Sequence, residues 1–457
     1  MNLEAFPADP GLPQLKIASD PGLMREVFRE YLSPLPGSVH HIQDCLLSWV
    51  RYLPGVRCTL QYTLRLVESG TGRTQNQWVS GVIYAEDRAE RIWRKLRAAH
   101  AGQEDPRAFE TFEPVSFIPD LNMVVQVFPY DRRLPTLPLV MTRPSTALEH
   151  QFFAWLGPGD WHPVDWNIQP IRYRAGARAV LRYETEIQDA MTGRREKKRF
   201  YVKVYRREEG EQTYQVLQAL WKRAEAGGDG FTVGRPIAYL PGLHALLQEE
   251  SPGTTLGELL LQNRTTSLAA RRIARALAIF NQDGVATTRR HSREDEISEL
   301  KWAGELLQWA CPHLAAEVDR IIGAVVAGVE EVPSGPTHRD LNPDHILLEG
   351  DRIALIDLDF FAEADPVLDA ATFLAHLCSM PLRFPVTHDR VQLAARAFAE
   401  EYFSHVPRAW RGRLPLHYAG ATLKAAVGFF RRQEPRWTEK IAALVKEARD
   451  SLDRRLW

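Results

Sequence analysis

The chain has 457 residues, which is enough for two or three domains with a substantial apolar core. Its 57 basic and 58 acidic side chains give a formal charge of −1, which argues against general binding to nucleic acid or to a membrane surface. The four cysteines lack the spacing of a zinc or disulfide framework, and neither a signal peptide nor a membrane-spanning stretch is indicated. We therefore expect a cytoplasmic protein.

Two segments in the first half of the chain repeat each other. Residues 51–73 align without gaps on residues 172–194 with nine of 23 positions identical, and residues 114–128 align on residues 236–250. The apolar and polar pattern predicts the same order in both copies: strand, turn, strand, turn, strand, helix, strand, strand. Two blocks in the same order at a nearly constant offset favour duplication of one small β-rich lobe.

The two copies differ at the third predicted strand. In the second copy this strand, residues 200–205, contains Lys203. The predicted helix that follows, from about residue 208 to about residue 225, contains Glu211 as the best candidate for an ion-pair partner of the lysine. The first copy has no lysine in the corresponding residues 80–82. We therefore expect the first copy to be a cap or docking domain that binds no nucleotide.

After the second copy, residues 245–256 predict a buried strand that ends in a Pro-Gly turn and leads into a helix. Apolar residues at helical spacing predict helices over residues 255–261 and 269–280. Two or three more helices are expected between residues 297 and 329. The chain therefore passes from a β-rich part into a helical part, which indicates an α+β fold.

A β-hairpin in the helical part carries two carboxylates. The tripeptide His338-Arg339-Asp340 leads into an apolar strand, a turn at residues 349–352 and a second apolar strand that ends at Asp357. Both carboxylates therefore lie at the same end of one hairpin. This arrangement suits phosphoryl transfer, because one Asp can orient a hydroxyl group while the other holds Mg²⁺ on the nucleotide phosphates.

These motifs resemble the catalytic and metal-binding loops of the aminoglycoside phosphotransferase and choline kinase-like family, whose members are relatives of the protein kinases and phosphorylate small molecules. The resemblance implies a protein kinase-like bilobal fold, here preceded by the degenerate copy of the N-terminal lobe. We expect a helical or extended segment over residues 1–44 and the degenerate lobe over residues 45–150. A nucleotide-binding lobe over residues 160–253 and a helical lobe over residues 254–457 would follow.

The resemblance also implies a set of roles for ATP and Mg²⁺ binding. Asp340 would be the catalytic base, and Asp357 would bind the metal. Lys203 would contact the α- and β-phosphates beneath a turn formed by residues 174–178. The backbone of the link between the lobes would contact the adenine, which gives as candidates Gln248, Glu249 and Glu250.

Three positions near the hairpin leave alternatives open. His345 replaces the Asn that usually serves as the second metal ligand, and imidazole suits softer metals better than Mg²⁺. This substitution is compatible with weakened Mg²⁺ binding, a preference for Mn²⁺, or an inactive relative. Asp359 is either a further metal ligand or a solvated side chain. Asp369 either holds the backbone of the catalytic loop or caps a helix.

The resemblance implies that the acceptor is a small molecule with a hydroxyl group. Residues 408–457 contain 12 Lys or Arg and 5 Asp or Glu, so the last helices are a poor match for a polycationic aminoglycoside. We therefore expect a neutral or anionic, sugar-like acceptor. A competing hypothesis is a pseudokinase that binds nucleotide or serves as a scaffold. The sequence does not determine the oligomeric state.

Overall fold

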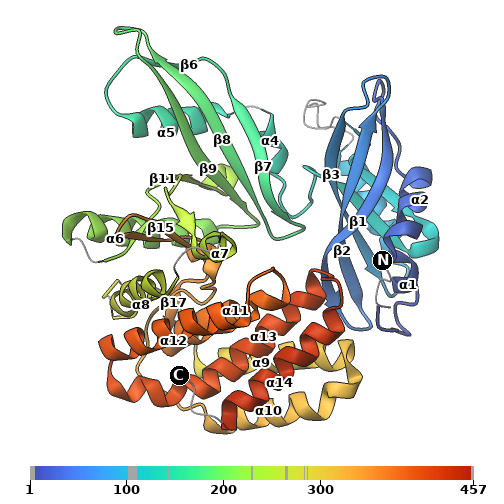
Figure 1. Cartoon of the computed structure of the whole chain (residues 1–457). Coiled ribbons are helices and arrows are strands. Elements are labelled where there is room, and N and C mark those ends of the chain that lie inside the picture. The colour runs from blue at the N-terminus through green and yellow to red at the C-terminus, as the bar shows by residue number, and fades with distance from the viewer. Residues whose placement is uncertain are drawn as a thin grey trace. The chain divides into compact units, whose positions relative to one another are not determined.

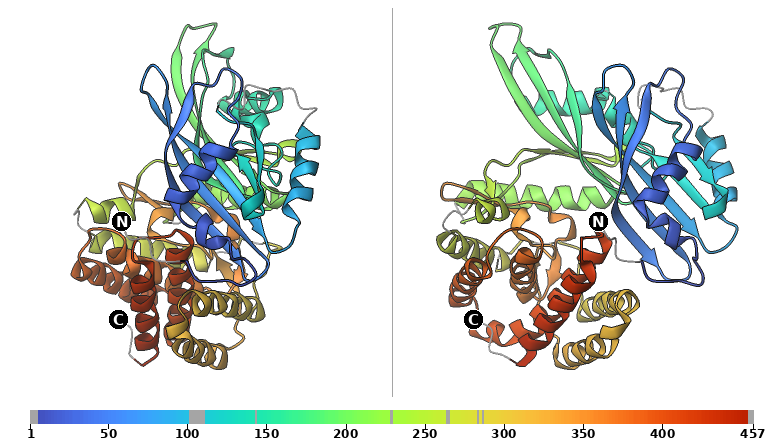
Figure 2. Two further views of the ribbon diagram at one scale, coloured as in Figure 1. Left: turned by 90° about the vertical axis from the view of Figure 1, so that its right-hand side faces the viewer. Right: turned by 45° about the vertical axis from the view of Figure 1, so that its right-hand side comes forward.

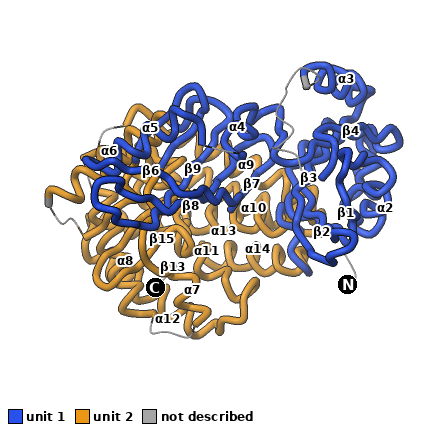
Figure 3. Tube along the Cα trace, turned by 90° about the horizontal axis from the view of Figure 1, so that it is seen from above, with its two compact units in different colours: residues 1–210, 237–247, 431–435 blue, residues 211–236, 248–430, 436–457 orange. Residues whose placement is uncertain are grey.

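The computed structural model describes residues 6–100, 111–142, 144–227, 230–262, 266–282, 284–285 and 287–453. The chain divides into two compact units (Figure 3). Unit 1 comprises residues 1–210, 237–247 and 431–435, and unit 2 comprises residues 211–236, 248–430 and 436–457. The β-rich part of the chain lies mainly in unit 1, and the helical part lies mainly in unit 2 (Figure 1).

The first sheet of unit 1 is antiparallel and has the strand order β1-β2-β3-β5-β4 (Figure 1). At the start of helix α2, the Asp20 side chain accepts hydrogen bonds from the backbone N–H groups of Gly22 and Leu23, and the helix packs along β1 (Figure 2). Helix α3 packs on β4 and β5. The elements are α1 (Leu15–Ala18), α2 (Pro21–Tyr31), β1 (His40–Leu53), β2 (Arg57–Glu68), β3 (Thr74–Tyr84), α3 (Ala89–His100), β4 (Val115–Ile118), the 3-10 helix η2 (Pro119–Leu121) and β5 (Met123–Val127).

The second sheet has the order β11-β12-β9-β8-β6, with β7 also paired to β8. Its core contains a stack of Phe152 of α5 on Phe200 of β9, with ring centroids 4.9 Å apart. The elements are α4 (Leu137–Met141), α5 (Thr146–Leu156), β6 (Trp161–Pro163), β7 (Asn167–Arg174), β8 (Arg178–Asp189), β9 (Arg195–Tyr205), α6 (Glu209–Gly227), β11 (Pro236–Leu240), η3 (Pro241–Leu243) and β12 (Ala245–Glu249).

The two sheets correspond strand for strand, because the order β1-β2-β3-β5-β4 recurs as β7-β8-β9-β12-β11. The register corresponds as well, since Thr59 lies opposite Val82 in the first sheet and Val180 lies opposite Lys203 in the second. Val82 is therefore the counterpart of Lys203. We call residues 7–128 module 1 and residues 129–250 module 2.

The expected domain boundaries do not coincide with the packing. Strand β1 begins at His40, so a boundary between residues 44 and 45 falls inside a strand. Helices α4 and α5, expected to belong largely to the first copy, bury Leu137, Val140, Leu148 and Phe152 in the core of the second sheet. Their apolar faces need that sheet as a partner, so the start of module 2 lies near residue 129 rather than residue 160.

Unit 2 consists of helices around two small sheets, one of order β10-β16-β15-β13 and one that pairs β14 with β17. Helices α7 and α9 begin with capping boxes, which satisfy backbone N–H groups at their first turns. The strands are β10 (Thr232–Val233), β13 (Thr254–Thr255), β14 (Gly335–Thr337), β15 (Ile346–Glu349), β16 (Arg352–Leu355) and β17 (Ala362–Ala364). The helices are α7 (Leu256–Leu261), α8 (Ser267–Asn281), α9 (Arg293–Ala310), η4 (Pro312–Leu314), α10 (Ala315–Gly328), η5 (Pro343–His345), η6 (Leu358–Phe360), α11 (Val367–Ser379), η7 (Met380–Leu382), α12 (His388–His405), η8 (Arg408–Arg413), α13 (Leu414–Arg431) and α14 (Trp437–Asp453).

Two expectations from composition can be compared with this structure. Within the part of the chain that is described, no helix is both long enough and apolar enough to span a bilayer. The four cysteines are buried and none of them forms a disulfide, and burial raises the pKa of both Cys45 and Cys378 to about 12. These thiols are therefore packing residues and not reactive groups.

Candidate active site

The loop between β14 and η5 is held by one buried carboxylate. Asp369 is fully buried in the first turn of α11, and its two carboxylate oxygens accept hydrogen bonds from the backbone N–H groups of His338 and Arg339 at 2.7 and 2.8 Å. Burial raises the pKa of Asp369 against the effect of these bonds. The side chain of Asn281 donates a further bond to it at 2.9 Å. Of the two roles left open for Asp369, the structure has the one that holds the loop.

The anchored loop has an unusual backbone. Arg339 adopts a left-handed conformation with φ of 66°, and so does Asp357 at the end of β16 with φ of 63°. Such conformations cost free energy for residues other than glycine, so the surroundings must hold them. The Nε2 atom of His338 contributes by bonding to the carbonyl group of Ile356 at 2.9 Å, which joins the loop to the end of the hairpin.

Three side chains at this end of the hairpin form a group that could hold a cation. One ligand atom from each of Asp340, His345 and Asp357 lies within 4.8 Å of the other two. The hairpin explains the arrangement, because β15 starts directly after His345 and β16 ends two residues before Asp357. The structure thus brings together the expected catalytic residue and two of the three expected metal ligands.

The hydrogen bonds of His345 determine which ring nitrogen faces the group. Its Nδ1 atom lies 2.8 Å from the carbonyl oxygen of Asp340 and so donates to it, which leaves Nε2 3.5 Å from a carboxylate oxygen of Asp357. Burial lowers the pKa of His345 and outweighs the nearby carboxylates, so the ring is neutral at pH 7. A neutral Nε2 and a carboxylate oxygen that face each other are both electron-pair donors. Their arrangement fits a shared divalent cation.

Asp359 is not a member of this group. It lies two residues beyond Asp357 on the short helix η6 and is half-buried, and its backbone carbonyl accepts a bond from Arg289 at 2.6 Å. Within the described residues, the group of three possible metal ligands that contains His345 is completed by Asp340 and Asp357 and does not include Asp359. The structure therefore gives no support to Asp359 as a third ligand beside His345.

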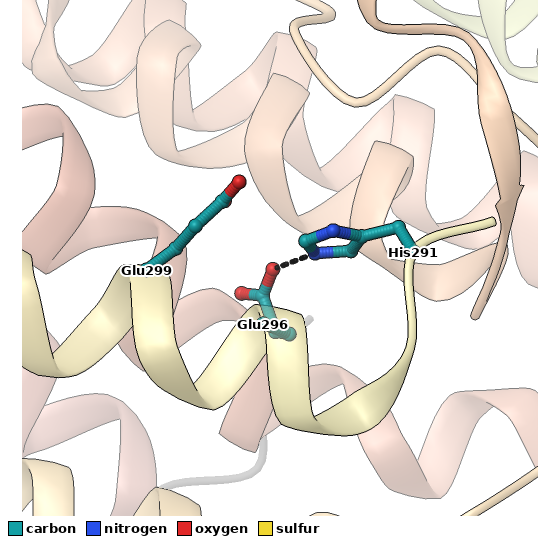
Figure 4. Close-up of side chains that lie close together, drawn as sticks. All are labelled: His291, Glu296 and Glu299. Atoms are coloured by element: carbon teal, nitrogen blue, oxygen red, sulfur yellow. Dashed lines mark hydrogen bonds and ion pairs between the residues drawn. The ribbon is translucent and has the colours of Figure 1, made fainter. Parts of the chain in front are cut away.

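A second cluster of acidic and imidazole groups lies beside Arg339 (Figure 4). Glu296 accepts bonds from His291 at 3.0 Å and from Lys424 at 2.7 Å, and these partners hold its pKa well below the usual range although burial alone would raise it. Glu299 accepts a bond from Arg339 at 2.7 Å. Because cations of the protein already pair with these carboxylates, the cluster orients Arg339 and does not fit a metal ion. The sequence motif indicated Arg339 but none of these partners.

The residues expected to bind the nucleotide lie in both units. Lys203 is half-buried on β9 of unit 1, with its Nζ atom 5.7 Å from the centroid of the Tyr205 ring. Glu211 is exposed in the first turn of α6 and belongs to unit 2, so its pairing with Lys203 stays a prediction. The side chain of Gln248 bonds to the Gly234 carbonyl group at 3.2 Å.

Glu249 and Glu250 complete the segment that is expected to bind adenine. The backbone N–H of Glu249 donates to the carbonyl group of Arg235 at 2.9 Å, so that donor is already used. Glu249 and Glu250 are both half-buried. Backbone contacts of Gln248, Glu249 and Glu250 with adenine stay a prediction.

In the turn expected to cover the phosphates, residues 174–178, three backbone N–H groups already donate to acceptors of the protein. Its Ala175 N–H donates to the side chain of Gln61 at 3.1 Å, and its Gly176 N–H donates to Asp131 at 2.5 Å. The Ala177 N–H donates to the carbonyl group of Arg174 at 3.0 Å, which closes the turn. In this arrangement these three backbone donors are unavailable to a phosphate, which differs from the expectation for this turn.

Comparison with known protein families gives a match for residues 189–416. Residues 189–416, which contain Lys203, the hairpin and Asp369, match the sequence model of a family described as "Phosphotransferase enzyme family". Residues 189–416 belong to that family. The chain therefore has an α+β fold of the protein kinase-like type, and its family membership supports a small-molecule phosphotransferase. No curated protein matched the sequence.

Several solved structures are similar to about 60% of the chain. A choline/ethanolamine kinase family protein from Mesorhizobium loti shares 13% identity, with a TM-score of 0.41 over 59% of this chain and 85% of that one. Choline kinase from Cryptosporidium parvum Iowa II shares 12% identity, with a TM-score of 0.43 over 63% and 89%. Amicoumacin kinase hAmiN, in complex with AMP-PNP, Ca²⁺ and Ami, shares 15% identity, with a TM-score of 0.41 over 62% and 88%.

Proposed function

We propose that the protein is an ATP-dependent phosphotransferase that phosphorylates a hydroxyl group of a small, neutral or anionic, sugar-like molecule. The group formed by Asp340, His345 and Asp357, on a loop anchored by Asp369, is the observation that carries this proposal. A carboxylate beside a cation-binding pair is the arrangement that phosphoryl transfer needs. The excess of basic residues in the last helices supports the choice of acceptor.

In the proposed reaction, Asp340 accepts a hydrogen bond from the acceptor hydroxyl and takes its proton as the reaction proceeds. The hydroxyl oxygen forms a bond to the γ-phosphorus, the bond from that phosphorus to the bridging oxygen breaks, and ADP leaves. Asp357 and His345 would hold a divalent cation, Mg²⁺ or Mn²⁺, which when bound neutralises charge on the phosphates. Asp369 keeps the loop in place through the two backbone N–H groups that it accepts.

Replacement of Asp340 tests this role. Asp340→Ala should lower turnover by about 1000-fold, since it removes the general base. The rise in melting temperature caused by MgATP should stay, because Asp357 and His345 are intact. Asp344→Ala is the matched control, since Asp344 is exposed in the same loop and lies outside the group of three. Turnover is measured as ADP release with a panel of hydroxyl compounds, and equal activity of the two variants would remove Asp340 from the mechanism.

Metal choice tests the role of His345. His345→Asn replaces the imidazole with an amide oxygen donor, so activity with Mg²⁺ should rise relative to activity with Mn²⁺. The ratio of the two initial rates is the measurement. An unchanged ratio would show that His345 does not contact the metal.

The alternative is a pseudokinase that binds nucleotide without turning it over. The occupied backbone donors at residues 175–177 favour it, because they leave the phosphates without the usual cover. The same ADP-release panel separates the two proposals. A MgATP-dependent melting shift without ADP release from any hydroxyl compound would support the pseudokinase.

A further inference from the structure

Guanidinium groups from both modules gather at the turn between β7 and β8 in unit 1. Arg51, at the end of β1, donates to the Ala175 carbonyl group at 3.1 Å. Arg133, just before α4, lies over Gly176, since a Cβ atom at that glycine would be 3.0 Å from its Cδ and 3.8 Å from its Nε and Nη1. Two arginines from separate parts of the chain therefore meet on one turn.

Two more arginines belong to the same cluster. Burial lowers the pKa of Arg51, and the positive charges of Arg57 and Arg206 lower it further, while Asp131 opposes them. For Arg133 the causes are burial and then the charges of Arg206, Arg57, Arg132 and Arg51, all in the same direction. A positive charge that lowers the pKa of Arg51 or Arg133 lies within electrostatic reach of that residue. We call Arg51, Arg57, Arg133 and Arg206 the arginine cluster.

The described residues supply little negative charge to this cluster. None of its four guanidinium groups forms an ion pair with a carboxylate in the described ranges. Asp131 is the acidic side chain at the turn, and its oxygens accept from the Tyr173 hydroxyl, the Gly176 N–H and the Arg133 N–H. One carboxylate balances at most one of the four positive charges, so a ligand with two or more negative charges would complete the site.

Module 1 shows that this fold does not need arginines at such a turn. Asp9 there accepts hydrogen bonds from Tyr52 and Gly55, just as Asp131 does from Tyr173 and Gly176. The counterpart of Arg133 is Gly11, and a Cβ there would be 3.0 Å from Gly55. The counterpart of Arg206 is Ala85, three residues after Val82 as Arg206 is three after Lys203. In both modules, an aspartate accepts hydrogen bonds from a tyrosine hydroxyl and a glycine N–H of the turn, and we call this arrangement the clamp. The clamp of module 1 forms without these two positive charges. The fold therefore does not require them in module 2, which points to a ligand.

We propose that the arginine cluster binds a phosphorylated small molecule other than the nucleotide, through its phosphate group. Guanidinium groups offer paired N–H donors that match phosphate oxygens, and a phosphate monoester or diphosphate carries the charge that one carboxylate cannot supply. The site is complete within unit 1. The proposal does not depend on whether the proposed phosphotransfer at Asp340 occurs.

Binding of inorganic pyrophosphate and of a sugar phosphate to the full chain tests this site, with isothermal titration and melting temperature as readouts. The double variant Arg133→Ala, Arg206→Ala should weaken binding of both ligands by at least tenfold. The control variant Arg65→Ala removes an exposed arginine of β2 in the same unit and should bind like the wild type. Without ligand, the double variant should melt no lower than the wild type, because it removes repulsion between like charges.

Three results would overturn the proposal. The first is an absence of saturable binding to the wild type. The second is unchanged affinity in the double variant, or a melting temperature that falls without ligand, which would make the arginines structural. The third is a loss of MgATP binding in the double variant as large as the loss of pyrophosphate binding, which would assign the cluster to the nucleotide. Retained MgATP binding supports a separate site.

Discussion

Modules 1 and 2 keep the same clamp at the tip of the first hairpin and differ on the third strand. In each module an aspartate from the segment before the sheet accepts hydrogen bonds from a tyrosine hydroxyl and a glycine N–H of the turn. The glycines of both turns have positive φ, 64° for Gly55 and 66° for Gly176. Removal of either aspartate would leave buried donors unpaired, which explains why both modules retain it.

The third strand differs between the modules at the position of Val82 and Lys203. Val82 packs against a buried cluster of Tyr84, Ala89 and Val124. Trp93 of α3 packs against the same cluster, and its ring stacks on Phe117 with centroids 5.7 Å apart. Its counterpart Lys203 is half-buried and close to the Tyr205 ring. A valine makes this face of module 1 apolar, whereas a lysine makes that of module 2 cationic. The two modules thus indicate that a buried hydrogen-bonded group is retained because the fold depends on it. A side chain on a face that is partly open to solvent can differ without loss of the fold, so the chemical function of that face can differ as well.

The largest expected difference between counterpart residues of the two modules concerns Lys203. Lys203→Met keeps the length of the side chain but removes its charge, so kcat/KM for phosphoryl transfer should fall by about 100-fold, the usual cost of one lost electrostatic contact to a reacting group. Val82→Ala at the counterpart position should change kcat/KM less than twofold, because module 1 carries no lysine there. Initial rates of ADP release provide the measurement. Similar losses in both variants would mean that the modules share the nucleotide site.

A smaller effect is expected on stability from the two clamps. Asp131 is 2% exposed and Asp9 is 9% exposed. Asp131→Ala and Asp9→Ala should each lower the free energy of unfolding by about 1–3 kcal/mol, the cost of unpaired buried donors. The loss should be greater for Asp131, since its removal also leaves the arginine cluster without its carboxylate. Urea denaturation measures both values, and a neutral Asp131→Ala would show that the clamp does not hold module 2.

The clamp of module 1 also has a pH dependence that a titration of stability can check. Burial alone would raise the pKa of Asp9, but bonds from Tyr52, Gly55 and Gly11 outweigh it and lower the pKa below the ordinary value of 3.8. A lowered pKa in the folded state means that the stabilisation is complete above pH 3.8 and is lost as the pH falls further. The difference in stability between wild type and Asp9→Ala should therefore shrink in acid.

Much of this architecture follows from sequence pattern. The hairpin turn, the order of elements along each copy of the repeat and helices α7 and α8 lie where alternation and helical spacing predict them, because local patterns report which side of an element is buried. The similarity between the two copies also extends further toward the N-terminus than residues 51 and 172. Pro7 to Leu15 and Pro129 to Leu137 share the pattern Pro-x-Asp-x-x-Leu-Pro-x-Leu, and an extended self-comparison would have found it.

The surroundings of Arg339 and the arginine cluster do not follow from any local sequence pattern. Arg339 pairs with Glu299 of α9, and Lys424 of α13 pairs with Glu296 and Glu299. Both helices are distant from Arg339 along the chain, and each of these partners is an ordinary charged residue on a helix. The arginine cluster likewise joins residues 51 and 206, which no local pattern connects. Contacts between distant side chains depend on how elements pack, so only the structure brings them together.

The location of Asp131 limits how this chain can be shortened. The residue follows directly on the last strand of module 1, yet its side chain clamps the first hairpin of module 2. The family-matched segment begins only at residue 189, after both β7 and most of β8. A fragment that starts there, or at residue 160, lacks the clamp and the helices that cover the second sheet. The part of this chain that matches the family model therefore does not contain the whole second sheet, and a shortened version that keeps this sheet and its clamp has to begin before residue 129.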